Sequence, residues 1–302
     1  MTGGRGGHEL RIHLSLLTAQ VGFAIFPVLG RVALAEIPAL VAASIRVVTA
    51  ALLFEAIRRF AGASRIAATD RPRVLLYALL GVSLNQVLFI IGLSMTSAIN
   101  TAIMTASIPA FTLGVAVALG REKLSRRAAL GVALAGAGAL LLLDAARLQL
   151  GSSYLLGNFL LLLNCLSYAA YLVLSRPIAS RYPIVSVVAL LFRFGAVPIV
   201  LVSLPALLAF DYRVSGRAWA SLAGIILLCT VIPYFLNFWA LSHTDASRVA
   251  LYVFLQPLVS TLLAILFLGE RLTGRTLAAG ALILAGLGVT AIGGRLLRRP
   301  VP

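Results

Sequence analysis

The sequence predicts an all-α membrane protein with ten transmembrane helices, arranged as two inverted five-helix repeats. Three observations lead to this fold class: an apolar composition, ten apolar segments of spanning length, and an internal duplication. Of the 302 residues, 61% are hydrophobic and 11% are charged, whereas a soluble domain carries about 25% charged residues. The mean hydropathy is +1.04. Because so little charge cannot cover a soluble surface, we expect the lipid bilayer to surround the chain.

The apolar segments have the length that a membrane requires, since about 20 apolar residues cross the hydrocarbon core as a helix. Pro38 and Pro183 stand at the starts of the second and seventh segments, where a first-turn proline is favoured. The first segment continues to about Leu29 without a small-residue cleavage site, so we expect a retained helix and not a signal peptide. The segments are 13–31, 37–57, 74–94, 98–119, 125–143, 153–175, 184–209, 218–240, 246–268 and 273–294.

The net charge of +16 comes from 25 Lys and Arg against 9 Asp and Glu. In a soluble protein this balance would suggest nucleic acid, but here the basic residues lie between apolar segments, so no nucleic-acid partner is expected. A cytoplasmic N-terminus places 17 of the 25 basic residues on the cytoplasmic side and 6 on the other. The sequence therefore predicts a multi-pass protein of the cytoplasmic (inner) membrane with both termini in the cytoplasm.

Cysteine and histidine give no sign of a metal or cofactor. Cys165 and Cys229 both fall inside predicted spans, where a free thiol behaves as a small apolar group. The three histidines show no ligand spacing. We expect neither a disulfide, a metal nor a cofactor.

An internal repeat is the most informative feature of the chain. At an offset of 148 positions, residues 92–138 align without a gap to 240–286, with 14 identities in 47 positions. Pro109 meets Pro257, and Glu122 meets Glu270. Earlier spans align at offsets of 145 and 147, the latter matching Arg46 with Arg193.

The repeat predicts two halves, 1–148 and 149–302, each with five spans. Because five is odd, the second half enters the bilayer with the opposite orientation. Inverted repeats are characteristic of secondary transporters, in which the halves exchange conformations to open alternately to either side. A duplicated sensor or scaffold that moves no solute remains the alternative.

The repeated segments carry a family resemblance. They read GLSMTSAINTAIMTASIPAFTLGVAVALGREKLSRRAALGVALAGAG in the first half and ALSHTDASRVALYVFLQPLVSTLLAILFLGERLTGRTLAAGALILAGLG in the second. This pattern resembles the EamA family of the drug/metabolite transporter superfamily. The resemblance implies ten helices with a substrate cavity between the halves, and export of an amino acid or related solute. A drug, nucleoside or other metabolite carrier of the same superfamily is the second interpretation.

Polar side chains inside the spans are the candidate substrate-binding residues, since a polar group in lipid costs free energy and should face the bundle interior. Hydrogen bonding between helices is an equal alternative for each of them. Asn158 lies in the same span as three of the candidates. The candidates are Gln20, Asn85, Gln86, Asn100, Asn164, Tyr168, Tyr171, Tyr234, Asn237, Trp239, Tyr252 and Gln256.

The matched prolines and arginines are further candidates. A proline inside a helix removes one backbone hydrogen bond, so Pro109 and Pro257 predict kinks that line the cavity and flex as gates. Arg46 and Arg193 lie near the eighth or ninth residue of their spans, deep enough for a guanidinium to attract a substrate anion. The alternative for both arginines is a bond to neighbouring carbonyls that locks the helices.

Groups near the span ends are expected to be structural. Glu122 and Glu270 are predicted to cap the helix that follows each of them, and His243, Asp245 and Arg248 are predicted to form a solvated loop. Small residues of the fifth and tenth spans fit either packing within the chain or a homodimer face. Catalytic motifs are missing from the sequence, so an enzyme is not expected.

Overall fold

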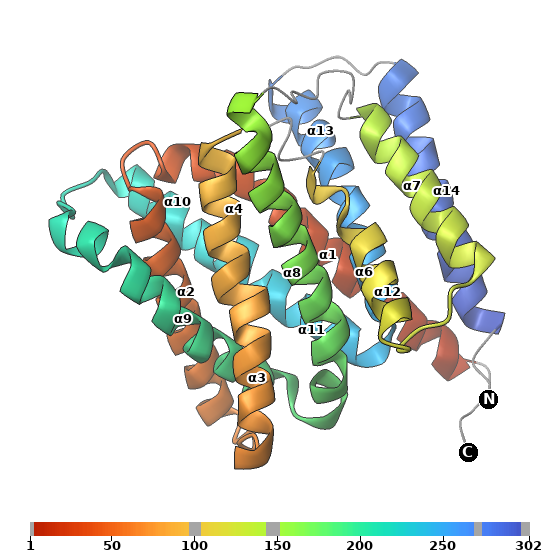
Figure 1. Ribbon diagram of the computed structural model, residues 1–302, viewed down its shortest axis with the longest axis horizontal. Coiled ribbons are helices and arrows are strands. Elements are labelled where there is room, and N and C mark those ends of the chain that lie inside the picture. Colours follow the sequence, from red (N-terminus) through yellow and green to blue (C-terminus); the bar gives the residue numbers. More distant parts are fainter. Residues whose placement is uncertain (1–2, 97–103, 143–151, 269–273, 297–302) are drawn as a thin grey trace.

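The computed structural model describes residues 3–96, 104–142, 152–268 and 274–296 (Figure 1). Every regular element in these ranges is helical, which confirms the all-α fold class. The first half contains α1 (Gly3–Ala33), α2 (Ala39–Phe60), η1 (Ala68–Asp70), α3 (Arg71–Ala78), η2 (Leu79–Leu84), α4 (Asn85–Ser94), α6 (Ile108–Ala118) and α7 (Arg126–Leu142). The second half contains α8 (Ser152–Arg181), α9 (Ile184–Ala209), α10 (Gly216–Ile226), η4 (Leu227–Val231), α11 (Ile232–His243), α12 (Ala246–Leu251), η5 (Tyr252–Phe254), α13 (Leu255–Leu268) and α14 (Gly274–Leu296).

Six segments of the described chain are long and apolar enough to cross a membrane. They are 7–30, 39–60, 68–89, 154–181, 184–209 and 216–243, and shorter apolar helices cover 108–118, 246–259 and 277–289. Lipid offers no hydrogen bonds to a backbone, so helices satisfy their peptide groups internally. The count of ten spans and their inverted orientation stay predictions.

Two of the long segments contain a π-helical turn at equivalent places. The turn η2 interrupts the helix formed by α3 and α4, and the turn η4 interrupts the one formed by α10 and α11. Their first residues, Leu79 and Leu227, are separated by the same 148 positions as the sequence repeat. Such turns are rare and occur frequently at functional sites. The turns come just before Gln86 and Tyr234, two of the candidate binding residues.

The matched prolines lie in different local structures, and only Pro109 departs from the kink that the sequence suggested. Pro109 is the second residue of α6, and it follows a non-helical turn that ends at Ser107. Pro257 is the third residue of α13, directly after the 3₁₀ turn η5. A first-turn proline gives up no intrahelical hydrogen bond, because the first N–H groups of a helix have no partner within it. Pro109 therefore begins a new helix after a break, whereas Pro257 lies in a continuous helical run that tightens into a 3₁₀ turn just before it, and the kink there stays a prediction.

Equivalent helices of the two halves pack side by side. Helix α2 packs along α9, and α7 packs along α14 (Figure 1). Glycines allow the second pair its close approach: a Cβ atom on Gly138 would lie 2.7 Å from the carbonyl oxygen of Ala279, and one on Gly286 would lie 2.6 Å from that of Gly131. Gly138 and Gly286 therefore pack within the chain, and the alternative of a homodimer face stays a prediction.

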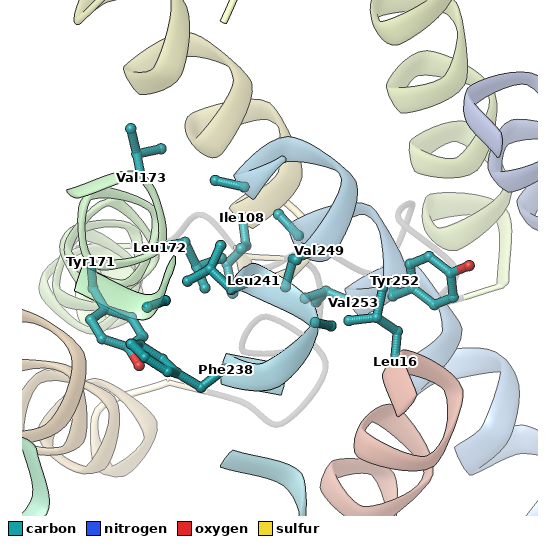
Figure 2. Packing of buried hydrophobic residues seen from close by; sticks show 14 of the residues in the cluster. Leu16, Ile108, Tyr171, Leu172, Val173, Phe238, Leu241, Val249, Tyr252 and Val253 are labelled. Atoms are coloured by element: carbon teal, nitrogen blue, oxygen red, sulfur yellow. The ribbon is translucent and has the colours of Figure 1, made fainter. Parts of the chain in front are cut away.

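Two hydrophobic cores join the halves. The first surrounds α8, α11, α12 and η5, where the rings of Tyr171 and Phe238 stack with centroids 6.4 Å apart (Figure 2). The second lies between α2, α9 and α10, with the Phe54 and Phe192 rings 5.2 Å apart. Each core draws residues from both halves, so the halves fold as one body.

Candidate functional site

The centre of the candidate site is a group of four side chains, here called the Arg46 cluster: Arg46, Gln86, Tyr234 and Phe26. The Arg46 guanidinium donates a hydrogen bond to the Gln86 side-chain carbonyl and lies over the Phe26 ring, 5.3 Å from its centroid. Gln86 also lies within hydrogen-bonding reach of Tyr234. The cluster brings together α1, α2, α4 and α11, and hence both halves.

Aromatic rings fix the position of Tyr234. The Phe192 ring meets it edge-on with centroids 4.9 Å apart, and the Phe23 ring does so at 5.7 Å. Edge-to-face geometry places a positive ring edge against a negative face, which favours one ring orientation. The Tyr234 ring is thus positioned beside Arg46 by residues of α1 and α9.

A second polar group continues the site along α11. Asn237 donates a hydrogen bond to the Tyr168 hydroxyl oxygen at 3.0 Å. The Tyr168 and Tyr171 ring centroids are 5.7 Å apart. Tyr234 and Asn237 are three residues apart and lie on one face of α11. The structure therefore joins five of the sequence candidates: Gln86, Tyr168, Tyr171, Tyr234 and Asn237.

Two buried polar atoms of this region have no partner within the described residues. They are the Nε–H donor of Arg46 and the Oδ1 acceptor of Asn237. Buried polar groups in proteins are nearly always hydrogen-bonded, so such exceptions call for an explanation. A zwitterion would satisfy both atoms, since its anionic group accepts from the Arg46 donor and its cationic group donates to the Asn237 acceptor.

Other candidates make hydrogen bonds between helices. Gln256 donates to the Gln20 carbonyl at 2.7 Å and joins α13 to α1. Asn164 donates to the backbone carbonyl of Asn85 at 2.6 Å, and Asn158 accepts from Thr96 at 2.7 Å. These contacts fit the alternative of helix fastening.

Three further candidates lie apart from the Arg46 cluster. Arg193 is exposed and lies over the Phe194 ring, 5.8 Å from its centroid. Trp239 packs on His243 with ring centroids 4.4 Å apart, at the end of α11. Tyr252 is hydrogen-bonded to His13. Asn100, like Glu270, lies outside the described residues.

Sequence reasoning missed a group of buried charges at the start of α1. Arg248 donates to Glu9 at 2.7 Å and to His13 at 3.0 Å. The Arg248 side chain is only 11% exposed, so the expectation of a solvated loop was wrong for this residue. The signal available in the sequence was a carboxylate and an imidazole four residues apart, on one face of the first helix.

Glu122 also differs from its expected role. Its carboxylate accepts the backbone N–H of Ser247 at 3.2 Å, in the first turn of α12. The helix that follows Glu122 is capped instead by Ser125, whose hydroxyl accepts the Ala128 N–H at 3.0 Å. Burial raises the pKa of Glu122 above its ordinary value. A carboxylate of the first half therefore caps a helix of the second.

Two cavities of the described structure lie away from the Arg46 cluster. One, of about 160 Å³, is lined by the loop after α6 and by α8, including Glu122 and Arg176. The other, of about 500 Å³, is an apolar groove between α6 and α7. The cavity expected between the halves stays a prediction.

Comparison with known proteins decides the family. The profile of the EamA-like transporter family matches residues 10–144 and again residues 155–292. The chain belongs to the EamA-like transporter family. It is therefore a multi-pass membrane protein, and the two matches cover nearly its whole length.

Relatives of this EamA-like chain come from plants, archaea and bacteria. "Protein WALLS ARE THIN 1" of Arabidopsis thaliana is 29% identical over 92% of the chain and 82% of that protein. A "Probable amino-acid metabolite efflux pump" of Salmonella typhimurium is 29% identical over 76% of the chain and 81% of that protein. A solved crystal structure, 19% identical, superposes with a TM-score of 0.79 over 95% of the chain and 99% of its own. The last likeness concerns the fold alone.

Proposed function

We propose that this EamA-like chain is a secondary transporter that exports a small carboxylate-bearing metabolite, an amino acid or a related solute, across the cytoplasmic membrane. The family and the relative described as an amino-acid metabolite efflux pump support this reading. The observation that carries it is the environment of Arg46, a cation inside the bundle.

The partners of Arg46 in the described structure are neutral. They are the amide of Gln86 and the ring of Phe26. A charged side chain within a membrane protein is costly and normally serves an ion or substrate path. A substrate carboxylate would supply the missing negative charge, since a guanidinium presents paired donors that match its two oxygens. The proposal assigns this carboxylate to Arg46, with Gln86 and Tyr234 beside it.

The amino group of the substrate is assigned to Asn237. Its Oδ1 atom is buried and has no partner within the described residues. A substrate ammonium donates hydrogen bonds and would satisfy it, while the ring of Tyr168 supplies an aromatic face nearby. The carboxylate and amino ends of one small molecule would then contact α2 and α11, one from each half.

Alternating access is proposed from the two-half arrangement. Equivalent helices of the halves, 1–148 and 149–302, pack against each other in the α2–α9 and α7–α14 pairs. A substrate held between them would be exposed to one side at a time as the halves rock. The positions where we expect the helices to flex are the matched π turns beside the site, the helix break before Pro109 and the 3₁₀ turn before Pro257.

The test is solute counterflow in proteoliposomes of the purified chain. Vesicles are loaded with unlabelled neutral L-amino acids, and uptake of the labelled forms is compared with that of their amides, which lack the carboxylate. We expect saturable counterflow of at least one amino acid and about 100-fold weaker counterflow of its amide, the effect of losing one charge-assisted contact. Nucleosides and lipophilic cations complete the panel. Flux of these alone would favour the other carrier class, and no flux from folded protein would favour a scaffold.

A further inference from the structure

The start of α1 and the short helix α12 are joined by a cluster of four ionisable side chains, here called the Glu9 cluster: Glu9, His13, Arg248 and Tyr252. Arg248 donates from Nη2 to Glu9 Oε2 at 2.7 Å and to His13 Nε2 at 3.0 Å. His13 is hydrogen-bonded through Nδ1 to the Tyr252 hydroxyl. Two residues come from each half, so the cluster bridges the halves.

The Glu9 cluster combines low exposure with a contact between the two halves. The side chains of Arg248 and Glu9 are 11% and 16% exposed. Arg58 beside Glu55 is also 11% exposed, but that pair lies within α2 and joins no two helices. The other arginines that pair with Glu55 and Asp70 include Arg59 at 72% exposed and Arg181 at 64%. A buried ion pair is strongly destabilised when one partner loses its charge, whereas an exposed pair contributes little. The Glu9 cluster is therefore sensitive to protonation in a way that the exposed pairs are not.

Other titratable groups surround the cluster. His8 on α1 has its ring 5.1 Å from that of His243 on α11. At the N-terminus of α12, Asp245 pairs with Arg176 of α8 at 2.8 Å. Three other elements pack on α1. The side chain that α13 presents to it is the neutral Gln256, and η4 contains Cys229. The charged residue of α10 is Arg217, which lies at the opposite end of the bundle. With Glu122 on the Ser247 N–H, these contacts hold α12 from three sides.

The hydrogen bonds define the protonation state of the closed arrangement. Arg248 is always a donor, so the Nε2 atom of His13 accepts and carries no proton. The neutral imidazole then has its hydrogen on Nδ1, where it donates to Tyr252. Glu9 is ionised opposite the guanidinium. A proton on Nε2 would place two cations in contact, and a proton on Glu9 would remove the ion pair.

Proton uptake is therefore linked to separation of the halves. The closed arrangement requires Glu9 charged and His13 neutral, while the separated arrangement removes the guanidinium that opposes a proton on either group. The state that binds protons more readily is favoured as the pH falls. The physical consequence is that acid weakens the contact between α1 and α12.

We propose that Glu9 and His13 form a proton-binding site, and that a proton bound there opens this end of the transporter by releasing Arg248. The role of this proton as the coupling ion rests on the proposed transport function. The opening itself does not, and it can be measured without any substrate.

The test measures the distance between α1 and the end of α8, which belong to different halves, by double electron–electron resonance. Spin labels replace Leu10 and Ser180, both exposed, in full-length protein in nanodiscs whose native Cys165 and Cys229 are changed to serine. We expect the ratio of long to short distances to rise at least about tenfold between about pH 8 and pH 5.5, the range in which histidine titrates. A tenfold change in this ratio requires that the separated arrangement binds the proton about ten times more tightly than the closed one.

Variants assign the response to this site. Glu9→Gln and Arg248→Gln should each show the long distance at about pH 8 already and respond little to acid. The matched control is Glu55→Gln, which neutralises a glutamate paired with Arg58 and Arg59 within α2 only; it should keep the wild-type response. A wild-type distance that does not change with pH, or a full response in Glu9→Gln, would overturn the proposal. Absence of counterflow would count against transport and leave this result standing.

Discussion

Arg46 and Arg193 were matched by the internal repeat, yet they lie in different surroundings. Arg46 is enclosed by Gln86 and Phe26 of its own half, whereas Arg193 is exposed beside Phe194. The helix starts explain the difference, since α2 begins at Ala39 and α9 at Ile184. Arg46 is thus the eighth residue of its helix and Arg193 the tenth. Two residues turn an α-helix by about 200°, so the two side chains leave opposite faces.

The comparison shows what an offset between repeats can and cannot predict. Matching at 147 positions predicted a similar depth for the two arginines but not the direction of either. Near the π turns and the paired glycines the offset is 148, and there the equivalence holds in space. The direction of a side chain depends on the register from its own helix start.

The largest expected effect is on transport. Arg46→Gln should lower counterflow of the best amino acid about 100-fold, because the carboxylate loses its charged partner. Arg46→Lys should recover part of it, since the charge is kept but the paired donors are lost. Arg193→Gln is the matched control and should stay within about twofold of wild type, since exposed charges contribute little. Equal losses of counterflow in Arg46→Gln and Arg193→Gln would show that the two arginines act alike, contrary to the difference in their surroundings.

The next effect is on stability, at positions where the repeat does hold. Gly138→Ala and Gly286→Ala should each lower the free energy of unfolding by about 1–3 kcal/mol, because the added Cβ meets backbone atoms. Gly288→Ala has nothing within 4 Å and should be neutral or stabilising by up to about 1 kcal/mol. Thermal exposure of the buried thiols Cys165 and Cys229 reports unfolding. A neutral result at both tight positions would mean that α7 and α14 are not held this closely.

The smallest expected effect is on the pH dependence of stability, which should differ between Glu36 and Glu122. Hydrogen bonds from the Ser215 side chain and backbone lower the pKa of Glu36, while burial raises that of Glu122. The stability that Glu36 contributes is present above its ordinary pKa and is lost as pH falls below it. The contribution of Glu122 is largest below its ordinary pKa and is lost as pH rises.

Melting temperatures measured between about pH 3.5 and pH 7 show whether the stability contributed by each glutamate rises or falls with pH. The advantage of wild type over Glu36→Gln should grow as pH rises across this range, and the advantage over Glu122→Gln should shrink. Parallel slopes for the two variants would contradict the assignment of opposite shifts.

The sequence was sufficient for the helical class and for the family, because apolar runs and the repeated segments are properties of the chain alone. It also placed Gln86 and Tyr234 at matched depth, and the structure joins both to Arg46. Composition could not predict that Pro109 begins a helix, because proline is compatible with both a kink and a first turn. Nor could it pair Glu9 with Arg248, which are 239 residues apart, since such a contact depends on how helices pack.

The two π turns have a consequence for the history of the molecule. They begin 148 residues apart, at the same offset that relates the best-matched segments downstream. A π turn inserted separately into one copy would have shifted that copy by one residue against the other. The shared offset therefore indicates that the widened turn was already present before the two repeated segments diverged, so that each segment carries the same irregularity just before Gln86 or Tyr234.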